Sequence, residues 1–114
     1  VLGGRSAGAR VACRLAQSLG AVGCVGLAFP LHPPGRAGAT RLPELLAVRV
    51  PLLVVQGERD SFGEPAEFPE AIELVPIPDA DHGFKTPKRA ELTQQQTFDL
   101  IVEAVVEWIT VRVG

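Results

Sequence analysis

The sequence predicts one domain of the α/β class, in which about four parallel strands form a sheet that has helices on both faces. The first observation is that apolar segments typical of buried strands alternate with segments of helical spacing. The second is that strands joined in this way run parallel, since each crossover returns the chain to the same end of the sheet. The length of 114 residues suffices for a single domain over residues 1–114, and not for two.

Composition and charge exclude several classes of protein. Apolar residues make up 46 % of the chain and charged residues 21 %, as in proteins with a folded core. The net charge is −2 and the basic residues are scattered, so no nucleic-acid partner is predicted. No apolar run reaches the roughly 18 residues of a membrane span, and no basic segment precedes an apolar one at the N-terminus. Neither a membrane partner nor a signal peptide is therefore predicted.

The two cysteines, Cys13 and Cys24, are too few for a disulfide framework. Each falls in an apolar segment, so we expect two buried, reduced thiols that pack as small hydrophobic residues. Reduced thiols favour a cytoplasmic location. A disulfide between the two cysteines, or a redox role, is the alternative.

The first half of the chain predicts two strands around one helix, followed by a long loop. Residues 1–3 end a strand, and residues 7–19 form a helix that Gly20 stops. Residues 21–29 are a nearly unbroken apolar run, typical of a strand covered on both faces. Residues 30–43 contain four prolines, and a loop of this length in a small domain indicates a site. The apolar stripe predicted for the helix comprises Val11, Ala12, Leu15, Ala16 and Leu19.

The second half predicts two further strands and two helices. Residues 50–56 are the clearest strand, since four large apolar residues follow one another. A short helix is predicted over residues 64–71, and a strand over residues 73–77 that Pro76 assigns to the edge of the sheet. The final helix runs roughly over residues 93–111. Its predicted apolar stripe comprises Phe98, Ile101, Val102, Val105, Trp108 and Ile109.

The motif G-x-S-x-G occurs as Gly4-Arg5-Ser6-Ala7-Gly8, between the first strand and the first helix. This is the context of a nucleophile elbow, a sharp turn that raises a serine hydroxyl off the end of a sheet. Gly4 and Gly8 lack a Cβ, so the strand and the helix can approach each other around Ser6. The Ala7 amide at the helix N-terminus is a candidate oxyanion-hole donor. Alternatively, Ser6 only caps the helix, or the turn binds phosphate.

Two further candidate catalytic residues follow later strands. Asp60 lies in the loop after the third strand, and His82 lies in a D-H-G-F turn after the fourth. Because the C-terminal ends of parallel strands meet at one edge of a sheet, we expect Ser6, Asp60 and His82 to converge there. Asp79 and Asp81 are the alternatives to Asp60 as the carboxylate that orients the base.

The remaining candidate is His32, which follows the second strand in the proline-rich loop. It is a candidate substrate-binding residue, and the alternative is a loop position without a chemical role. No cluster of residues has metal-ligand spacing, and no nucleotide-binding motif is present, so no metal and no cofactor is predicted.

Three runs carry a resemblance to a known family: LGGRSAGARVA at residues 2–12, FPLHPPG at residues 29–35, and LVVQGERD at residues 53–60. With them, the chain resembles the C-terminal portion of an α/β-hydrolase of the dienelactone-hydrolase-like branch. It is especially similar to a subgroup of small hydrolase-like proteins that includes a testis-expressed protein and a subunit of a histone acetyltransferase complex. The resemblance covers nearly the whole chain.

The resemblance implies a partial α/β-hydrolase fold, because that family has about eight strands and the chain supplies the last four. We therefore expect an N-terminally truncated domain, without the loop that gives the second oxyanion-hole amide. We also expect the exposed first strand to self-associate or to pair with another chain.

The order Ser, Asp, His along the chain is that of α/β-hydrolases. It implies a serine hydrolase that acts on a small ester, thioester or similar acyl substrate through an acyl-enzyme. Ser6 is the predicted nucleophile, His82 the general base, and Asp60 the residue that orients the imidazole. With half of the oxyanion hole, the truncated chain is expected to have little activity. The alternative function is a non-catalytic, hydrolase-like module for protein interaction.

Overall fold

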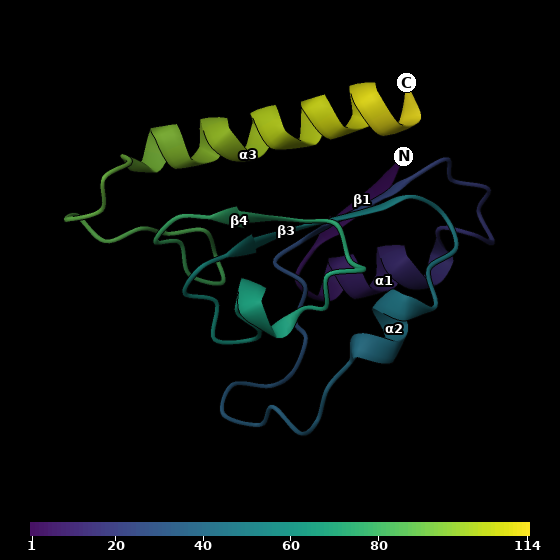
Figure 1. Cartoon of the computed structure of the whole chain (residues 1–114), viewed down its shortest axis with the longest axis horizontal. Helices are drawn as coiled ribbons and strands as arrows, with labels where there is room; N and C mark the ends of the chain where they lie inside the picture. The colour runs from purple at the N-terminus through teal and green to yellow at the C-terminus, as the bar shows by residue number, and fades with distance from the viewer.

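The computed structural model describes residues 1–114 and contains one four-stranded sheet. The strands are β1 (Leu2–Arg5), β2 (Cys24–Leu27), β3 (Leu52–Gly57) and β4 (Leu74–Ile77). They lie side by side in the order of the sequence, and every neighbouring pair is parallel (Figure 1). The predicted parallel sheet is therefore confirmed, and β4 with its proline lies at the edge as expected.

Helices cover both faces of this sheet, which confirms the predicted architecture. On one side lie α1 (Ala7–Leu15) and α2 (Leu42–Leu46), and on the other lies the long α3 (Gln94–Trp108) (Figure 1). A short 3₁₀ helix, η1 (Pro65–Glu67), follows the loop after β3, and a π-helical turn over Ile109–Val113 extends α3.

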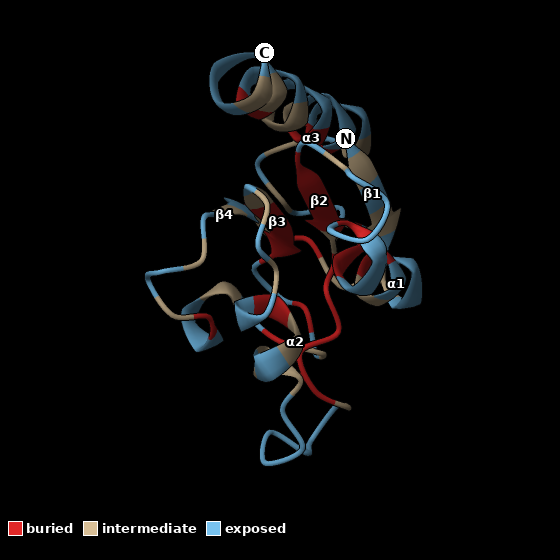
Figure 2. Cartoon of the chain, turned by 90° about the vertical axis from the view of Figure 1, so that its right-hand side faces the viewer, coloured by how far each residue is buried: buried red, intermediate tan, exposed pale blue.

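Two hydrophobic cores flank the sheet because side chains alternate between its faces along β3. Val54 belongs to the core under α1 and α2, whereas Leu53 and Val55 belong to the core under α3. All three side chains are buried, and Figure 2 shows β2 and β3 as the most deeply buried strands. Strands covered on both faces explain the unbroken apolar runs in the sequence. Both cysteines are free and lie in the first of these cores, as predicted.

The buried face of α1 differs from the predicted stripe. Val11, Leu15 and Leu19 are exposed, whereas Ala12 and Ala16 are buried as expected, together with Ala9 and Cys13. The reason is the close approach of α1 to the sheet: a Cβ at Gly26 of β2 would lie 3.6 Å from the Cβ of Ala9. Only small side chains fit at that distance, so the larger ones point away. The helix also ends at Leu15, four residues earlier than predicted.

The helix predicted over residues 64–71 is reduced to η1, which spans three residues. Pro69 explains the difference, because a proline lacks the N–H that a continuing helix needs and excludes helical geometry from the residue before it. Phe68 accordingly has extended backbone angles, with φ −93° and ψ 140°. A turn closed by a hydrogen bond of 3.0 Å from Ile72 N to the Pro69 carbonyl oxygen then leads into β4.

The final helix starts where the sequence predicts, because Thr93 and Gln96 form a capping box. Thr93 Oγ1 accepts a hydrogen bond from Gln96 N, and Gln96 Oε1 accepts one from Thr93 N. The predicted apolar stripe is only partly buried: Ile101 and Trp108 face the sheet, whereas Phe98 and Val102 are 44 % and 60 % exposed. A four-stranded sheet is too narrow to cover the whole stripe. No helix is both long and apolar enough to cross a membrane.

The loop after β2 begins in the interior of the protein, because its first residues, Phe29 to His32, are buried. His32 lies between two acceptors: its Nδ1 is 2.8 Å from the Pro33 carbonyl oxygen, and its Nε2 is 2.7 Å from Glu67 Oε1. The hydrogen bond to Pro33, assisted by Glu67, raises the pKa of the imidazole. The pKa of the Glu67 carboxyl is lowered, chiefly because it accepts a hydrogen bond from Glu64 N. The pair ties this loop to η1.

A matched pair of substitutions tests how closely β1 and α1 approach. A Cβ at Gly4 would lie 2.2 Å from the Gly8 carbonyl oxygen, whereas a Cβ at Gly8 would meet nothing within 4 Å. The expectation that both glycines are needed for the close approach is therefore wrong for Gly8. We expect Gly4→Ala to lower the free energy of unfolding by about 1–3 kcal/mol. Gly8→Ala should leave it unchanged or raise it by up to about 1 kcal/mol, in urea denaturation.

The bond between His32 and Glu67 predicts a pH-dependent contribution to stability. The raised pKa of His32 stabilises the fold below its ordinary value of 6.5, and this contribution is lost as the pH rises through the folded-state pKa. The lowered pKa of Glu67 stabilises the fold above 4.5, and that contribution is lost as the pH falls. His32→Gln should therefore cost most stability between these values and much less near pH 9, by urea denaturation. An equal loss at about pH 5.5 and pH 9 would contradict this.

Candidate active site

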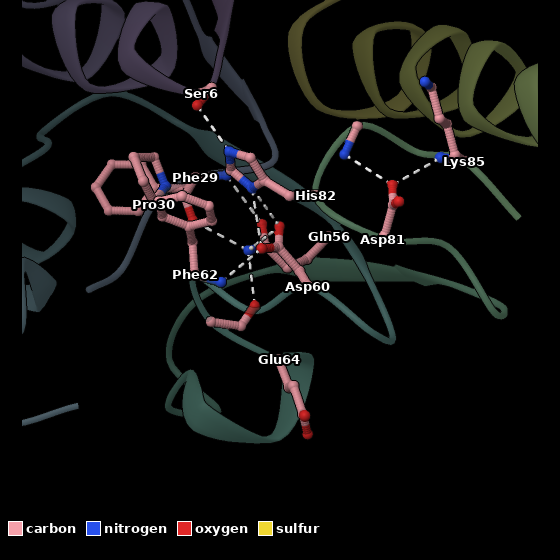
Figure 3. Close-up of polar contacts among 12 residues, drawn as sticks. Ser6, Phe29, Pro30, Gln56, Asp60, Phe62, Glu64, Asp81, His82 and Lys85 are labelled. Atoms are coloured by element: carbon pink, nitrogen blue, oxygen red, sulfur yellow. Dashed lines mark hydrogen bonds and ion pairs between the residues drawn. The ribbon is translucent and has the colours of Figure 1, made fainter. Parts of the chain in front are cut away.

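The turn between β1 and α1 holds Ser6 in an unusual backbone conformation. Its φ is 54° and its ψ is −120°, a region that residues with a side chain rarely adopt. The turn is held by a hydrogen bond of 2.9 Å from Ser6 N to the Leu27 carbonyl oxygen at the end of β2. The Ser6 side chain makes no capping hydrogen bond to α1, so the capping alternative is wrong. Its hydroxyl points instead across the edge of the sheet toward His82 (Figure 3).

Three side chains that are far apart in the sequence form one hydrogen-bonded chain at this edge. Ser6 Oγ lies 2.8 Å from His82 Nε2, and His82 Nδ1 lies 2.9 Å from each carboxylate oxygen of Asp60 (Figure 3). With Asp60 ionised, Nδ1 carries the proton, and Nε2 is free to accept a hydrogen bond from the Ser6 hydroxyl. The residues come from the loops after β1, β3 and β4, whose C-terminal ends share one edge.

The Asp60 carboxylate is completely buried, and its hydrogen bonds compensate for this burial. Besides His82, it accepts a hydrogen bond of 2.8 Å from Phe62 N at Oδ1 and one of 3.2 Å from Gln56 Nε2 at Oδ2. Burial raises the pKa of the Asp60 carboxyl, and the hydrogen bonds from His82 and Phe62 N oppose that rise. Both oxygens are thus held toward the imidazole.

The imidazole of His82 is held by contacts on several sides. The Phe62 ring stacks on it, with centroids 4.1 Å apart and planes tilted by 30°. Asp81 Oδ1 accepts hydrogen bonds of 2.9 Å from Gly83 N and Lys85 N, which close the turn that presents His82 (Figure 3). The side chain of His82 remains 23 % exposed, so an incoming molecule can reach it.

The alternative carboxylates have other surroundings. Asp79 has a φ of 58°, and its amide donates a hydrogen bond to Glu58 Oε1, in the turn before Ala80. The side chain of Asp81 is engaged with backbone amides, as described above. Among the three acidic residues considered from the sequence, only Asp60 is hydrogen bonded to His82.

The two other predicted site residues, Ala7 and His32, are not part of the hydrogen-bonded chain from Ser6 to Asp60. Ala7 is the first residue of α1, directly after Ser6, where helix amides lack intrahelical acceptors. His32 is buried, and both of its ring nitrogens are engaged with Pro33 and Glu67. A substrate contact through either nitrogen of His32 would first require one of these bonds to break.

Gln56 and Phe62 contact the site but were not predicted from the sequence. A signal was present for Gln56, because it is the one polar side chain in the apolar run of β3. Burying an amide there has a cost that only hydrogen bonds can offset. For Phe62 no signal existed, since one aromatic residue in a loop has many uses.

Comparison with known proteins identifies the family and the fold of the chain. Residues 1–110 match the model of a family described as an alpha/beta hydrolase domain. A comparison with curated proteins found no match.

Solved structures with the same fold include several hydrolases. An esterase domain from Rhodothermus marinus aligns with a TM-score of 0.68 and 14 % identity, covering 98 % of this chain and 60 % of that one. An α/β serine hydrolase without a lid from Xanthomonas campestris aligns with a TM-score of 0.57 and 25 % identity, covering 93 % and 46 %. A serine hydrolase homologue from Coxiella burnetii aligns with a TM-score of 0.58 and 20 % identity, covering 92 % and 47 %.

The chain thus spans between 46 % and 60 % of the length of these structures. The alignment with the Rhodothermus marinus esterase domain covers almost all of this chain. Because the family model matches residues 1–110 of this chain, the chain belongs to the alpha/beta hydrolase domain family.

Proposed function

We propose that the protein is a serine hydrolase that cleaves a small ester, thioester or similar acyl compound through an acyl-enzyme. The observation that carries this proposal is the hydrogen-bonded chain from Ser6 through His82 to the buried Asp60. A serine hydroxyl is a weak nucleophile unless an adjacent base accepts its proton, and this arrangement supplies one. Membership of the hydrolase family supports the same conclusion.

In the proposed reaction, Ser6 Oγ attacks the carbonyl carbon of the substrate while His82 Nε2 accepts the hydroxyl proton. Asp60 keeps the imidazole in the productive tautomer and stabilises its cation. The Ala7 amide donates a hydrogen bond to the oxyanion of the tetrahedral intermediate. His82 then gives the proton to the leaving group, and the acyl group stays on Ser6. Water then attacks the acyl carbon while His82 accepts a proton from it. The bond from the acyl carbon to Ser6 Oγ breaks, His82 returns the proton to Ser6 Oγ, and the acid is released.

The substrate class is proposed from the openness of the site and from the solved structures. Within residues 1–114, Ser6 is partly exposed at the edge of the sheet, and none of the four surface cavities is lined by Ser6, Asp60 or His82. The Xanthomonas campestris hydrolase is described as lacking a lid, and the Rhodothermus marinus domain as an esterase. A small, water-accessible ester or thioester fits these observations. Turnover would require no metal or other cofactor.

A second amide donor for the oxyanion is expected from outside residues 1–114. Removal of one donor from such a site costs on the order of 10²–10³ in rate, so Ala7 alone would support slow turnover. The outer edge of β1 has no paired strand in the four-stranded sheet. We propose that a further strand, from the same protein or a second copy, pairs there and brings the missing amide close to Ser6.

A fluorophosphonate probe tests the nucleophile. We expect the probe to label the protein at Ser6, because phosphonylation needs only the activated hydroxyl and its base. Ser6→Ala and His82→Ala should abolish labelling, as measured by intact-mass spectrometry and peptide mapping. Ser18→Ala is the matched control, since Ser18 Oγ is bonded to the Leu15 carbonyl oxygen on an exposed turn. A folded protein that stays unlabelled would favour the non-catalytic interaction module.

Substitution of Asp60 by Asn tests the role of the carboxylate. An amide in place of the carboxylate favours the wrong tautomer of His82, so the labelling rate should fall by roughly 10⁴-fold. Glu58→Gln is the control, because Glu58 is exposed and lies in the same loop without contacting His82. Equal rates for Asp60→Asn and Glu58→Gln would mean that Asp60 does not orient the base.

A further inference from the structure

Gln56 is a buried polar residue in a position where the strand otherwise carries only apolar side chains. It is fully buried, one residue before the end of β3, and the four residues before it are Leu52, Leu53, Val54 and Val55. A leucine in its place would bury no polar group of its own. The amide must therefore serve an interaction that an apolar side chain cannot provide.

The Gln56 amide connects two loops at the active edge of the sheet (Figure 3). Its Oε1 accepts a hydrogen bond of 3.0 Å from Phe29 N, after β2. Its Nε2 lies 3.0 Å from the Phe29 carbonyl oxygen, 2.8 Å from the Gly63 carbonyl oxygen and 3.2 Å from Asp60 Oδ2. Each end of the amide thus meets groups of the opposite hydrogen-bonding kind.

These partners determine the orientation of the amide. If it were turned by 180°, Oε1 would face three acceptors, including the Asp60 carboxylate, and Nε2 would face the Phe29 N–H. Only the observed orientation satisfies the buried groups. Gln56 therefore presents Nε2 to Asp60 Oδ2, and its two N–H groups are shared among three acceptors, of which Oδ2 is the most distant at 3.2 Å.

We propose that Gln56 is a positioning residue for the hydrolytic reaction, and that its amide holds the Asp60 carboxylate with both oxygens facing His82 Nδ1. This inference rests on the proposed function. It extends the set of three residues by one that touches neither the substrate nor the imidazole. We call residues 58–64, which carry Asp60 and Gly63, the acid loop.

The number of donors around the carboxylate shows why Gln56 matters. Oδ1 accepts from Phe62 N and faces His82 Nδ1, whereas Oδ2 has only Gln56 and His82 as partners. Without the Gln56 amide, one oxygen of a completely buried carboxylate would depend on His82 alone. Rotation of the carboxylate toward another donor, or displacement of the acid loop, would then change the His82 geometry. A misplacement of about 1 Å in such a site costs on the order of 10²-fold in rate.

Gln56 also holds the backbone of the acid loop, through the hydrogen bond from its Nε2 to the Gly63 carbonyl oxygen. The same loop is bound from the β2 side by the hydrogen bond of 3.0 Å from His32 N to the Phe62 carbonyl oxygen. A Cβ at Gly63 would lie 2.8 Å from the Cβ of Leu31, so the two loops are in direct contact. The carboxylate and the backbone that carries it are thus held by one side chain.

Two substitutions test this inference. Gln56→Leu removes the donor to Asp60 Oδ2 together with the hydrogen bonds of Gln56 to Phe29 and Gly63. Gln56→Glu keeps the shape. One oxygen of the introduced carboxyl group still faces Phe29 N, whereas the other faces Asp60 Oδ2 and two carbonyl oxygens. When ionised, the introduced carboxylate would therefore repel that of Asp60, with the His82 imidazole beyond it. Gln17→Glu is the matched control, because Gln17 is exposed on the turn after α1 and the substitution makes the same change in charge.

The first measurement is the rate of fluorophosphonate labelling at Ser6 between about pH 5 and pH 9. We expect Gln56→Leu to react on the order of 10²-fold more slowly than the unsubstituted protein at every pH. Gln56→Glu should approach the unsubstituted rate at low pH, where the introduced carboxyl group is protonated, and should lose rate as the pH rises. Gln17→Glu should follow the unsubstituted protein throughout. Should Gln56→Leu fail to fold by circular dichroism, the pH profile of Gln56→Glu decides alone.

The second measurement distinguishes this inference from the proposed function. The NMR resonance of the proton on His82 Nδ1 reports its hydrogen bond to Asp60 whether or not Ser6 reacts. We expect a low-field resonance in the unsubstituted protein and in Gln17→Glu, and its upfield shift or loss in Gln56→Glu at high pH. An unlabelled protein that still shows this change would overturn the proposed function and retain the positioning role. Unchanged labelling rates and an unchanged resonance in folded Gln56 variants would overturn the positioning role.

Discussion

A charged carboxylate buried without any exposure is the constraint on which the active edge of this protein depends. Asp60 is stable there only because Phe62 N, Gln56 Nε2 and His82 Nδ1 all donate to it. Each donor comes from a different part of the chain: the acid loop itself, the end of β3, and the loop after β4. The requirement to satisfy one carboxylate therefore brings these segments together and, through His82, directs the imidazole toward Ser6.

Strain at Ser6 is the second feature that the surrounding structure must support. A non-glycine residue in this backbone region costs on the order of 1–3 kcal/mol and persists only where its neighbours enforce it. Here β1 is held in register with β2, and Gly4 lets α1 return against the strand. The result is a hydroxyl that points away from its own helix and toward the base. Packing of α1 through alanines against Gly26 belongs to the same close approach.

The fold class and the positions of the candidate site residues could be predicted from the sequence with local rules. Apolar runs bounded by glycine and proline located the four strands, and strands joined by helices had to be parallel. Parallel order alone then placed Ser6, Asp60 and His82 at one edge. Errors arose where a helix met the sheet: periodicity showed that α1 and α3 are amphipathic, but not which residues of the stripe the narrow sheet could cover.

The sequence by itself determined the parallel topology, the elbow motif, and Ser6 and His82 as groups that converge, because these follow from residue type and strand order. Only the tertiary structure decided which carboxylate faces the imidazole, since Asp60, Asp79 and Asp81 are equivalent acids until their backbones are placed. The tertiary structure likewise revealed that Gln56 serves Asp60. Hydrogen-bond partners are set by the packing of loops after β2, β3 and β4, and no local pattern of residues encodes that packing.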